Sequence, residues 1–164
     1  MADRSTLNRR ALIVCLALSV QPAPASAQRA APAAAPITCT QPRAVDGDTL
    51  RCTSLSAPVR LLGIDAPELP GHCRRGRTCA PGDPVASRAA LASLIASGTV
   101  TVEIVGRDRY ARHLGVVRVR SALANPVTGA RATVNLSCAM IAAGQAIYVS
   151  AWDNGHRIVR ECGQ

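Results

Sequence analysis

The order of apolar and polar residues predicts a small β-barrel with helices appended to it. Short strand-like segments come first, and a helical segment, a pair of longer strands and a second helical segment follow. Turn residues separate each segment from the next. The length of 164 residues suits one such domain with an additional N-terminal segment.

Residues 1–27 have the three parts of a secretory signal peptide. Arg9 and Arg10 belong to a positive start, residues 11–20 form an apolar stretch, and residues 25–27 (Ala-Ser-Ala) provide a cleavage site. The apolar stretch is too short to span a bilayer, which takes about 20 residues. We therefore expect a periplasmic or secreted protein with no membrane attachment in its mature form.

Residues 28–36 are rich in Ala and Pro and show no periodicity, which is typical of a disordered linker. The folded domain is therefore expected over residues 37–164. We expect it to be a monomer.

The chain carries a formal net charge of +9, and its 19 basic residues are all arginine. This charge favours a polyanionic partner, although an Ala/Arg-rich composition can also reflect codon usage alone. Only Tyr110, Tyr148 and Trp152 are aromatic. The scarcity of aromatic residues argues against a protein that binds single strands by stacking bases on aromatic side chains.

Six cysteines remain once residue 15 is removed with the signal segment. An even number in an exported chain favours disulfides over zinc, and neither a Cys-x-x-Cys pair nor histidines at ligand spacing support a zinc site. Six cysteines allow fifteen connectivities. Proximity in sequence favours the pairs Cys39–Cys52, Cys73–Cys79 and Cys138–Cys162.

The periodicity places the individual elements in order. Strands are expected over residues 50–53 and 59–64, and a helix over residues 83–97, with Asp83 as its cap and Pro84 in its first turn. An alternating strand over residues 99–105 forms a hairpin with residues 114–119.

The C-terminal third of the chain has weaker signals. A second helix is expected over residues 133–143, closed by Gly144. Residues 152–155 have the composition of a turn.

Four carboxylates occur between residues 46 and 68 of this basic chain: Asp46, Asp48, Asp65 and Glu68. Acids at strand ends can converge in space, and such a cluster needs a cation to neutralise it. Carboxylate and carbonyl oxygens are the ligands that Ca²⁺ prefers. Each motif alone is weak, since Asp-Gly-Asp is a common turn sequence.

Arg60 and Arg112 are the two cations expected to face these acids. A guanidinium group matches two phosphate oxygens at once, so acids, a cation and two arginines together suit phosphodiester cleavage. An arginine in a strand more often serves only a solvated face or a single ion pair. The occurrence of these acids and arginines together, in this order, argues against such a purely structural explanation.

These stretches resemble the staphylococcal (micrococcal) nuclease, or thermonuclease, family. The resemblance rests on residues 45–49 (Val-Asp-Gly-Asp-Thr), 60–68 (Arg-Leu-Leu-Gly-Ile-Asp-Ala-Pro-Glu), 82–84, 108–112 (Asp-Arg-Tyr-Ala-Arg) and 134–135. It covers about residues 39–149. It implies an OB-fold, a five-stranded barrel with two or three helices. It also implies Ca²⁺-dependent hydrolysis of DNA and RNA that leaves a 3′-phosphate.

The resemblance also implies a role for individual residues. Asp48, Asp65 and the backbone carbonyl of Ala66 would bind Ca²⁺, with Asp46 and Thr49 behind them. Glu68 would orient or activate the attacking water. The residues implied to contact the substrate are Arg60 and Arg112 at the scissile phosphate, and Arg109 and Tyr110 at a neighbouring one.

The chain departs from the family in two places. Ala111 replaces the glycine of a Tyr-Gly-Arg motif; if that residue has a positive φ, alanine costs about 1 kcal/mol and could displace Arg112. The family's long C-terminal helix is not evident, and Tyr148 and Trp152 do not align clearly with its nucleotide-stacking tyrosines.

Two other functions remain open. The same barrel could be a non-catalytic module that binds nucleic acid or a protein through its basic surface, but such relatives usually lose the acids and arginines kept here. It could also be a disulfide-bonded structural domain that binds calcium for stability, which leaves Arg60 and Arg112 without a role.

Overall fold

The computed structural model describes residues 35–163, which contain nine strands, three α-helices and one 3₁₀ turn. The expected signal segment and the linker up to residue 34 lie outside the described residues. Within the described part, no helix is both long enough and apolar enough to cross a membrane.

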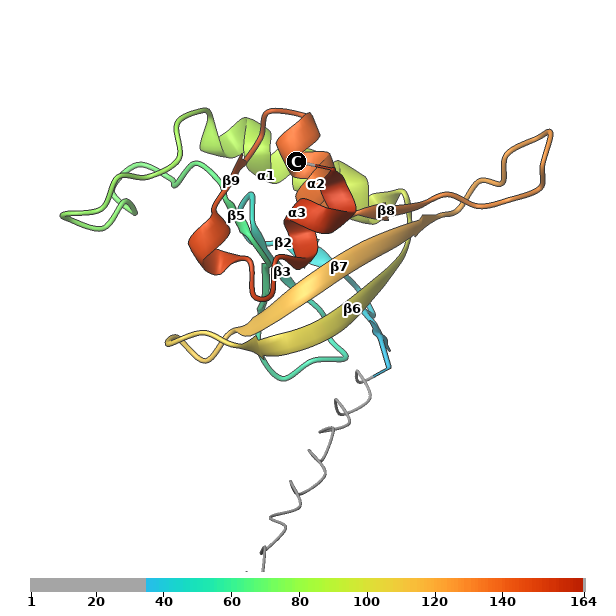
Figure 1. The fold of residues 1–164 in the computed structure, drawn as a ribbon, viewed down its shortest axis with the longest axis horizontal. Coiled ribbons are helices and arrows are strands. Elements are labelled where there is room, and N and C mark those ends of the chain that lie inside the picture. Colours follow the sequence, from blue (N-terminus) through green and yellow to red (C-terminus); the bar gives the residue numbers. More distant parts are fainter. Residues whose placement is uncertain (1–34, 164) are drawn as a thin grey trace, which may run out of the picture. The chain divides into compact units, whose positions relative to one another are not determined.

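A curled, mixed sheet forms the framework, with strand order β1-β6-β7-β4-β3-β2 and β8 added to β7 (Figure 1). The strands of this sheet are β1 (Ile37–Thr38), β2 (Arg43–Ala44), β3 (Thr49–Arg51), β4 (Val59–Leu61), β6 (Gly98–Arg107), β7 (His113–Ser121) and β8 (Thr133–Asn135). A second sheet pairs β5 (Ile64–Asp65) with β9 (Ile147–Tyr148). This arrangement is the half-barrel with helices expected of an OB-fold.

The long hairpin of β6 and β7 is the largest part of the sheet, and it agrees with the hairpin predicted from the alternating residues. Its register shifts by one residue between Ile104 and Gly106. Strand β4 joins the hairpin through a parallel pairing with β7, in which Arg60 lies opposite Leu114. The N–H of His113 continues this ladder by donating to the carbonyl of Pro58 at 2.9 Å.

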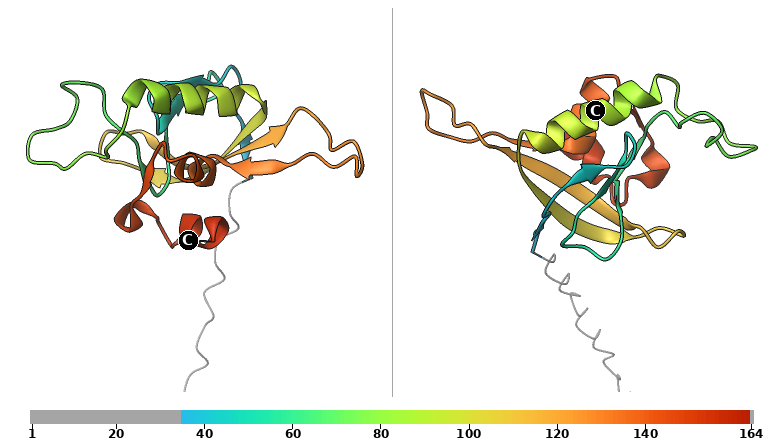
Figure 2. Two further views of the ribbon diagram at one scale, coloured as in Figure 1. Left: turned by 90° about the horizontal axis from the view of Figure 1, so that it is seen from above. Right: turned by 180° about the vertical axis from the view of Figure 1, so that it is seen from behind.

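The helices α1 (Pro84–Ala96) and α2 (Leu136–Ala142) lie on the same side of the β6–β7 hairpin (Figures 1 and 2). Helix α1 begins where the sequence predicts, because the Asp83 side chain accepts from the N–H groups of Val85 and Ala86 at 2.8 and 3.3 Å. The apolar faces of α1 and α2 close the core over the sheet. Their buried members are Leu91 and Ile95 of α1 and Leu136 and Met140 of α2.

Gly47 lets the Asp-Gly-Asp turn approach helix α1 closely. A Cβ atom at this position would lie 1.9 Å from Oγ of Ser87 and 2.7 Å from Cβ of Ala66. Ser87 is fully buried, and its hydroxyl donates to the carbonyl of Gln145 at 2.6 Å. The turn that carries Asp46 and Asp48 is therefore fixed against the helix by a contact that only glycine allows.

Two of the predicted elements were wrong in extent. The expected strand over residues 59–64 is divided at Gly63, whose φ of +72° turns the chain out of the main sheet and into β5. The expected helix over residues 133–143 begins only at Leu136. Residues 133–135 instead pair with β7 as β8, and Asn135 caps α2 by accepting from the N–H of Ser137 at 2.9 Å.

The C-terminal part consists of a 3₁₀ turn (Ser150–Trp152) and the short helix α3 (Arg157–Cys162). The buried carboxylate of Asp153 starts this helix by accepting from the N–H groups of Ile158 and Val159 at 3.0 Å. No long C-terminal helix occurs within the described residues. The structure has the three disulfides that proximity in sequence predicted, and Cys138–Cys162 joins α3 to α2.

Candidate functional site

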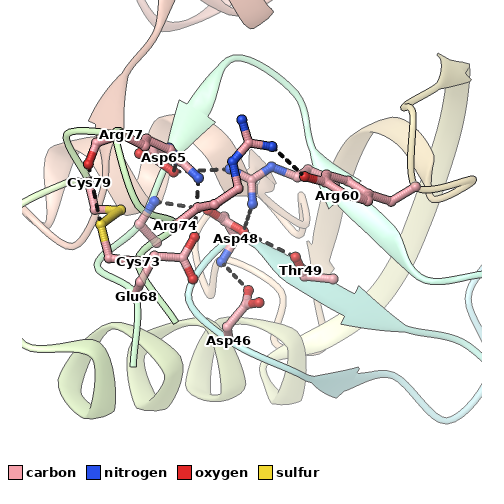
Figure 3. Close-up of polar contacts among 12 residues, drawn as sticks. Asp46, Asp48, Thr49, Arg60, Asp65, Glu68, Cys73, Arg74, Arg77 and Cys79 are labelled. Carbon is pink, nitrogen blue, oxygen red and sulfur yellow. Dashed lines mark hydrogen bonds and ion pairs between the residues drawn. A yellow bond between two sulfur atoms is a disulfide. The ribbon is translucent and has the colours of Figure 1, made fainter. Parts of the chain in front are cut away.

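Three neighbouring elements bring the predicted acids together. Asp48 lies at the end of the glycine turn before β3, Asp65 ends β5, and Glu68 follows three residues later. Arg60, in the middle of β4, lies between Asp48 and Asp65 (Figure 3). The short turn at Leu62 and Gly63 lets one chain segment supply both this arginine and Asp65.

Arg60 is buried, and both Nη groups of its guanidinium group donate to protein oxygens. Nη1 donates to Oδ1 of Asp48, while Nη2 donates to Oδ1 of Asp65 at 3.1 Å and to the carbonyl of Ile64 at 3.3 Å. The other oxygen of Asp48 accepts from the N–H of Ala66 at 2.9 Å. Charge-assisted bonds of this kind fix the geometry of the whole group.

Burial raises the pKa of Asp48 to about 7, although the nearby Arg60 acts in the opposite direction. The neighbouring Asp46 adds to the increase through like-charge repulsion. Asp46 itself bends back over its own turn and accepts from the N–H of Asp48 at 3.0 Å. A carboxyl group with such a raised pKa is one that an additional cation would stabilise in its charged form.

Arg77 is a member of this cluster that the sequence reasoning missed. Its Nη2 lies 2.5 Å from Oδ1 of Asp65, and its Nη1 lies 3.4 Å from Oε1 of Glu68. The hydrogen bond to Asp65 is the main reason why the pKa of Arg77 lies above its ordinary value. The only signal in the sequence is the arginine-rich stretch between Cys73 and Cys79.

Arg112 lies at the edge of the cluster and pairs with a different acid. Its Nε donates to Oδ2 of Asp108 at 2.7 Å, and its Nη1 lies 3.5 Å from Oγ1 of Thr49. Ala111 has a φ of +61°, so it adopts the strained left-handed conformation considered above. Asp108 nevertheless holds the turn by accepting from the N–H groups of Tyr110 and Arg112 at 2.9 and 3.0 Å.

Two aromatic side chains contact the arginines. Trp152 lies with its ring centroid 5.2 Å from Cζ of Arg60 and 5.0 Å from Cζ of Arg77. The exposed Tyr110 ring lies 4.9 Å from Cζ of Arg109 and 5.5 Å from Cζ of Arg112. At these distances each arginine gains a cation–π interaction.

These side chains line a cleft of about 1010 Å³. One wall is the segment from Arg60 to Arg77, a second is the hairpin tip from Asp108 to Leu114, and the third is the segment 151–154. The cleft thus collects Arg60, Arg74, Arg77, Arg109 and Arg112 around Glu68 and Asp46. Such a basic, acid-centred cleft can bind a phosphate group and place it beside a carboxylate.

The predicted cation ligands do not meet directly. Within residues 35–163, no three acidic, histidine or cysteine side chains converge in the manner of a metal site. Arg60 and Arg77 lie against the oxygens of Asp48 and Asp65 instead, and Ala66 presents its N–H to Asp48. Carboxylate oxygens are nevertheless the ligands that a hard divalent cation prefers.

Two comparisons with known proteins bear on this site. No curated protein matches the chain. A family model described as staphylococcal nuclease homologue matches residues 58–160, a stretch that includes Arg60, Asp65, Glu68 and Arg112 and begins after Asp48. This match covers more than half of the chain, which therefore belongs to the staphylococcal nuclease homologue family.

Proposed function

We propose that this protein is an exported, Ca²⁺-dependent phosphodiesterase that hydrolyses DNA and RNA by attack of a water molecule on phosphorus. The observation that carries the proposal is that Arg60, Glu68 and Arg112 line one basic cleft, while two buried aspartates, Asp48 and Asp65, pair with Arg60. Membership of the nuclease family supports the same reaction class. The three disulfides support export, because such bonds are typical of oxidising compartments.

Asp48, Asp65 and the carbonyl of Ala66 are the proposed ligands of calcium, with Asp46 and Thr49 holding Asp48 in place. A calcium ion bound there would neutralise charge on a phosphate oxygen as the reaction proceeds. The clustered carboxylates and the raised pKa of Asp48 support the presence of a cation.

Glu68 is the proposed group that orients the water and accepts its proton. It lines the cleft, and its side chain is 24% exposed, so a water molecule can reach it. Arg60 and Arg112 would bind the non-bridging oxygens of the scissile phosphate, where negative charge grows in the transition state. Arg109 and Tyr110, which are exposed on the hairpin tip, would hold a neighbouring phosphate.

The proposal is tested by digestion of single-stranded DNA and RNA with the oxidised protein, in Ca²⁺ or in excess EGTA. Glu68→Gln and Arg112→Ala should each lower cleavage by at least about a hundredfold, given the typical effect of removing a general base or a transition-state contact. Arg120→Ala, which removes an exposed arginine from β7, is the matched control and should cleave like the wild type.

Cleavage that persists in EGTA would contradict the role of calcium. Binding of nucleic acid without cleavage, unchanged by chelation, would instead identify the barrel as a non-catalytic binding module.

A further inference from the structure

A disulfide-closed ring delivers Arg77 to the acid cluster. The ring runs from Cys73 to Cys79, and the N–H of Arg77 donates to the carbonyl of Arg74 at 3.0 Å. Gly76 has a φ of +78°, which lets the chain make this turn without strain. The bond between the cysteines closes this ring, and Arg77 within it places Nη2 2.5 Å from Oδ1 of Asp65.

Two guanidinium groups meet at a single carboxylate oxygen. Oδ1 of Asp65 accepts from Nη2 of Arg60 at 3.1 Å and from Nη2 of Arg77 at 2.5 Å (Figure 3). Like charges placed this close repel each other, and the nearby acids offset that repulsion. Together the two groups bring a charge of +2 to the acids, which is the charge of one divalent cation.

The two arginines differ in how firmly they are held. Arg60 belongs to β4, is 8% exposed and bonds to three oxygens. The side chain of Arg77 is 30% exposed, and it extends from a loop outside the sheet. Arg77 is therefore the group that can leave Asp65 at little expense to the fold.

We propose that Arg77 is a tethered competitor of calcium, which occupies Asp65 and Glu68 until the free Ca²⁺ concentration is high enough to displace it. The proposal rests on the calcium site proposed above. The disulfide ring sets the local concentration of Arg77 at these acids, in the way a short linker does for a tethered ligand. The consequence is a calcium threshold raised towards the range typical of extracellular sites.

The structure also supplies a reporter of the exchange. Trp152 is the single tryptophan of the chain, and Cζ of Arg77 lies 5.0 Å from its ring centroid. When Arg77 leaves Asp65, its charge moves relative to the indole. The fluorescence of Trp152 should therefore change as calcium binds, and this signal does not depend on any cleavage.

The test is a Ca²⁺ titration of the oxidised full chain, followed by calorimetry and by Trp152 fluorescence. Arg77→Ala is compared with Arg75→Ala, which removes the same charge from an exposed position of the same ring. We expect Arg77→Ala to bind Ca²⁺ about tenfold more tightly than Arg75→Ala, because a hydrogen bond to a charged group no longer has to be displaced. The fluorescence change should be much smaller in Arg77→Ala.

Two further variants separate charge from tethering. Arg77→Lys keeps the cation and should bind Ca²⁺ within about threefold of the wild type. The double variant Cys73→Ser/Cys79→Ser opens the ring and should fall between the wild type and Arg77→Ala. Circular dichroism checks that each variant is folded.

Two results would overturn the competitor role, and they are distinguishable. Equal Ca²⁺ affinity in Arg77→Ala and Arg75→Ala, with binding intact, would overturn it and leave the proposed nuclease untouched. Absence of Ca²⁺ binding in every variant would overturn the calcium site itself and both proposals with it.

Discussion

Two clusters in this protein combine arginines with carboxylates, but they differ in charge balance and in burial. In the outer cluster, Arg118 forms two bonds to Glu161 at 2.8 and 3.0 Å and one to Glu103 at 3.3 Å, and Arg157 contacts Glu103 at 2.5 Å. Two arginines meet two glutamates there, and every member is partly exposed. This cluster is balanced in charge and has no need of a further ion.

The cleft cluster is unbalanced and buried. Asp48 and Asp65 are almost inaccessible, and with Asp46 and Glu68 they outnumber the arginines in contact with them by two. Removing charges from water is expensive unless each is well paired. The difference teaches that a cluster built only for stability can be neutral and exposed, whereas in this one two buried aspartates share an arginine beside a cleft that five arginines line.

The largest expected difference between the clusters concerns stability. Arg60→Ala removes the guanidinium group that pairs with both buried aspartates, Asp48 and Asp65, and we expect it to lower the free energy of unfolding by about 3–5 kcal/mol. Arg118→Ala removes partly exposed pairs and should lower it by about 1 kcal/mol or less. Urea denaturation in EGTA, followed by circular dichroism, measures both, and equal losses would refute the distinction.

The support of the cleft cluster by its glycine turn gives the next largest effect. Gly47→Ala places a methyl group against Ser87 and Ala66, and we expect a loss of about 2 kcal/mol. Gly129→Ala, at a position with φ of +67° and open space around it, should lose only about 1 kcal/mol. Thermal unfolding compares the two, and the double variant Gly47→Ala/Ser87→Gly should recover part of the loss.

The outer cluster should make the stability of the fold depend on pH in the acid range. The side-chain hydrogen bonds from Arg118 hold the pKa of Glu161 below its ordinary value of 4.5. A lowered pKa in the folded state means that the stabilisation is complete above pH 4.5 and is lost as the pH falls through the folded value. Because Glu161 is about one-third exposed, the contribution should be below about 1 kcal/mol.

Glu161→Gln should therefore flatten the acid limb of the stability curve and leave stability above pH 6 only slightly reduced. Urea unfolding between about pH 2.5 and 6, a range that brackets the ordinary pKa values of carboxyl groups, measures this effect. An unchanged slope would show that the pair contributes nothing in solution.

The smallest effect concerns the hairpin tip beside the cleft. Ala111→Gly relieves a left-handed alanine but adds freedom to the unfolded chain, and we expect a net gain in stability of about 0.5 kcal/mol or less. Because the bonds from Asp108 already hold Arg112, cleavage should change by less than about twofold. A larger gain in cleavage would show that Ala111 displaces Arg112.

Local signals made much of the fold predictable. The Asp83 cap, the alternation of residues 99–105 and the spacing of the cysteines each depend on nearby residues, and the structure agrees with them. The division at Gly63 was not predicted. The apolar run over residues 59–64 has the pattern of a single strand, and nothing in that pattern shows that its last residues pair in a second sheet. Strand β8 was missed because residues 133–135 directly precede a helical pattern, and their pairing with the distant strand β7 leaves no local signal.

The site was predictable only in part. Asp48, Arg60, Asp65 and Glu68 lie together as expected, since Asp48 and Asp65 stand at strand ends on either side of Arg60 and Glu68 follows β5 closely. Arg77 could not be foreseen, because nothing in a seven-residue ring reveals which of its three arginines turns inwards. Trp152 was left unassigned, since its contact with Arg60 depends on a 3₁₀ turn fixed by residues far along the chain.

The parallel pairing of β4 with β7 has a consequence for variation in this chain. Arg60 lies opposite Leu114, and Arg112 directly precedes the first residue of β7. The backbone pairing of the two strands thus fixes the backbone positions of these two arginines relative to each other. A single residue inserted between Arg112 and Leu114 would therefore shift Arg112 relative to Arg60, even if every residue of the hairpin tip were kept.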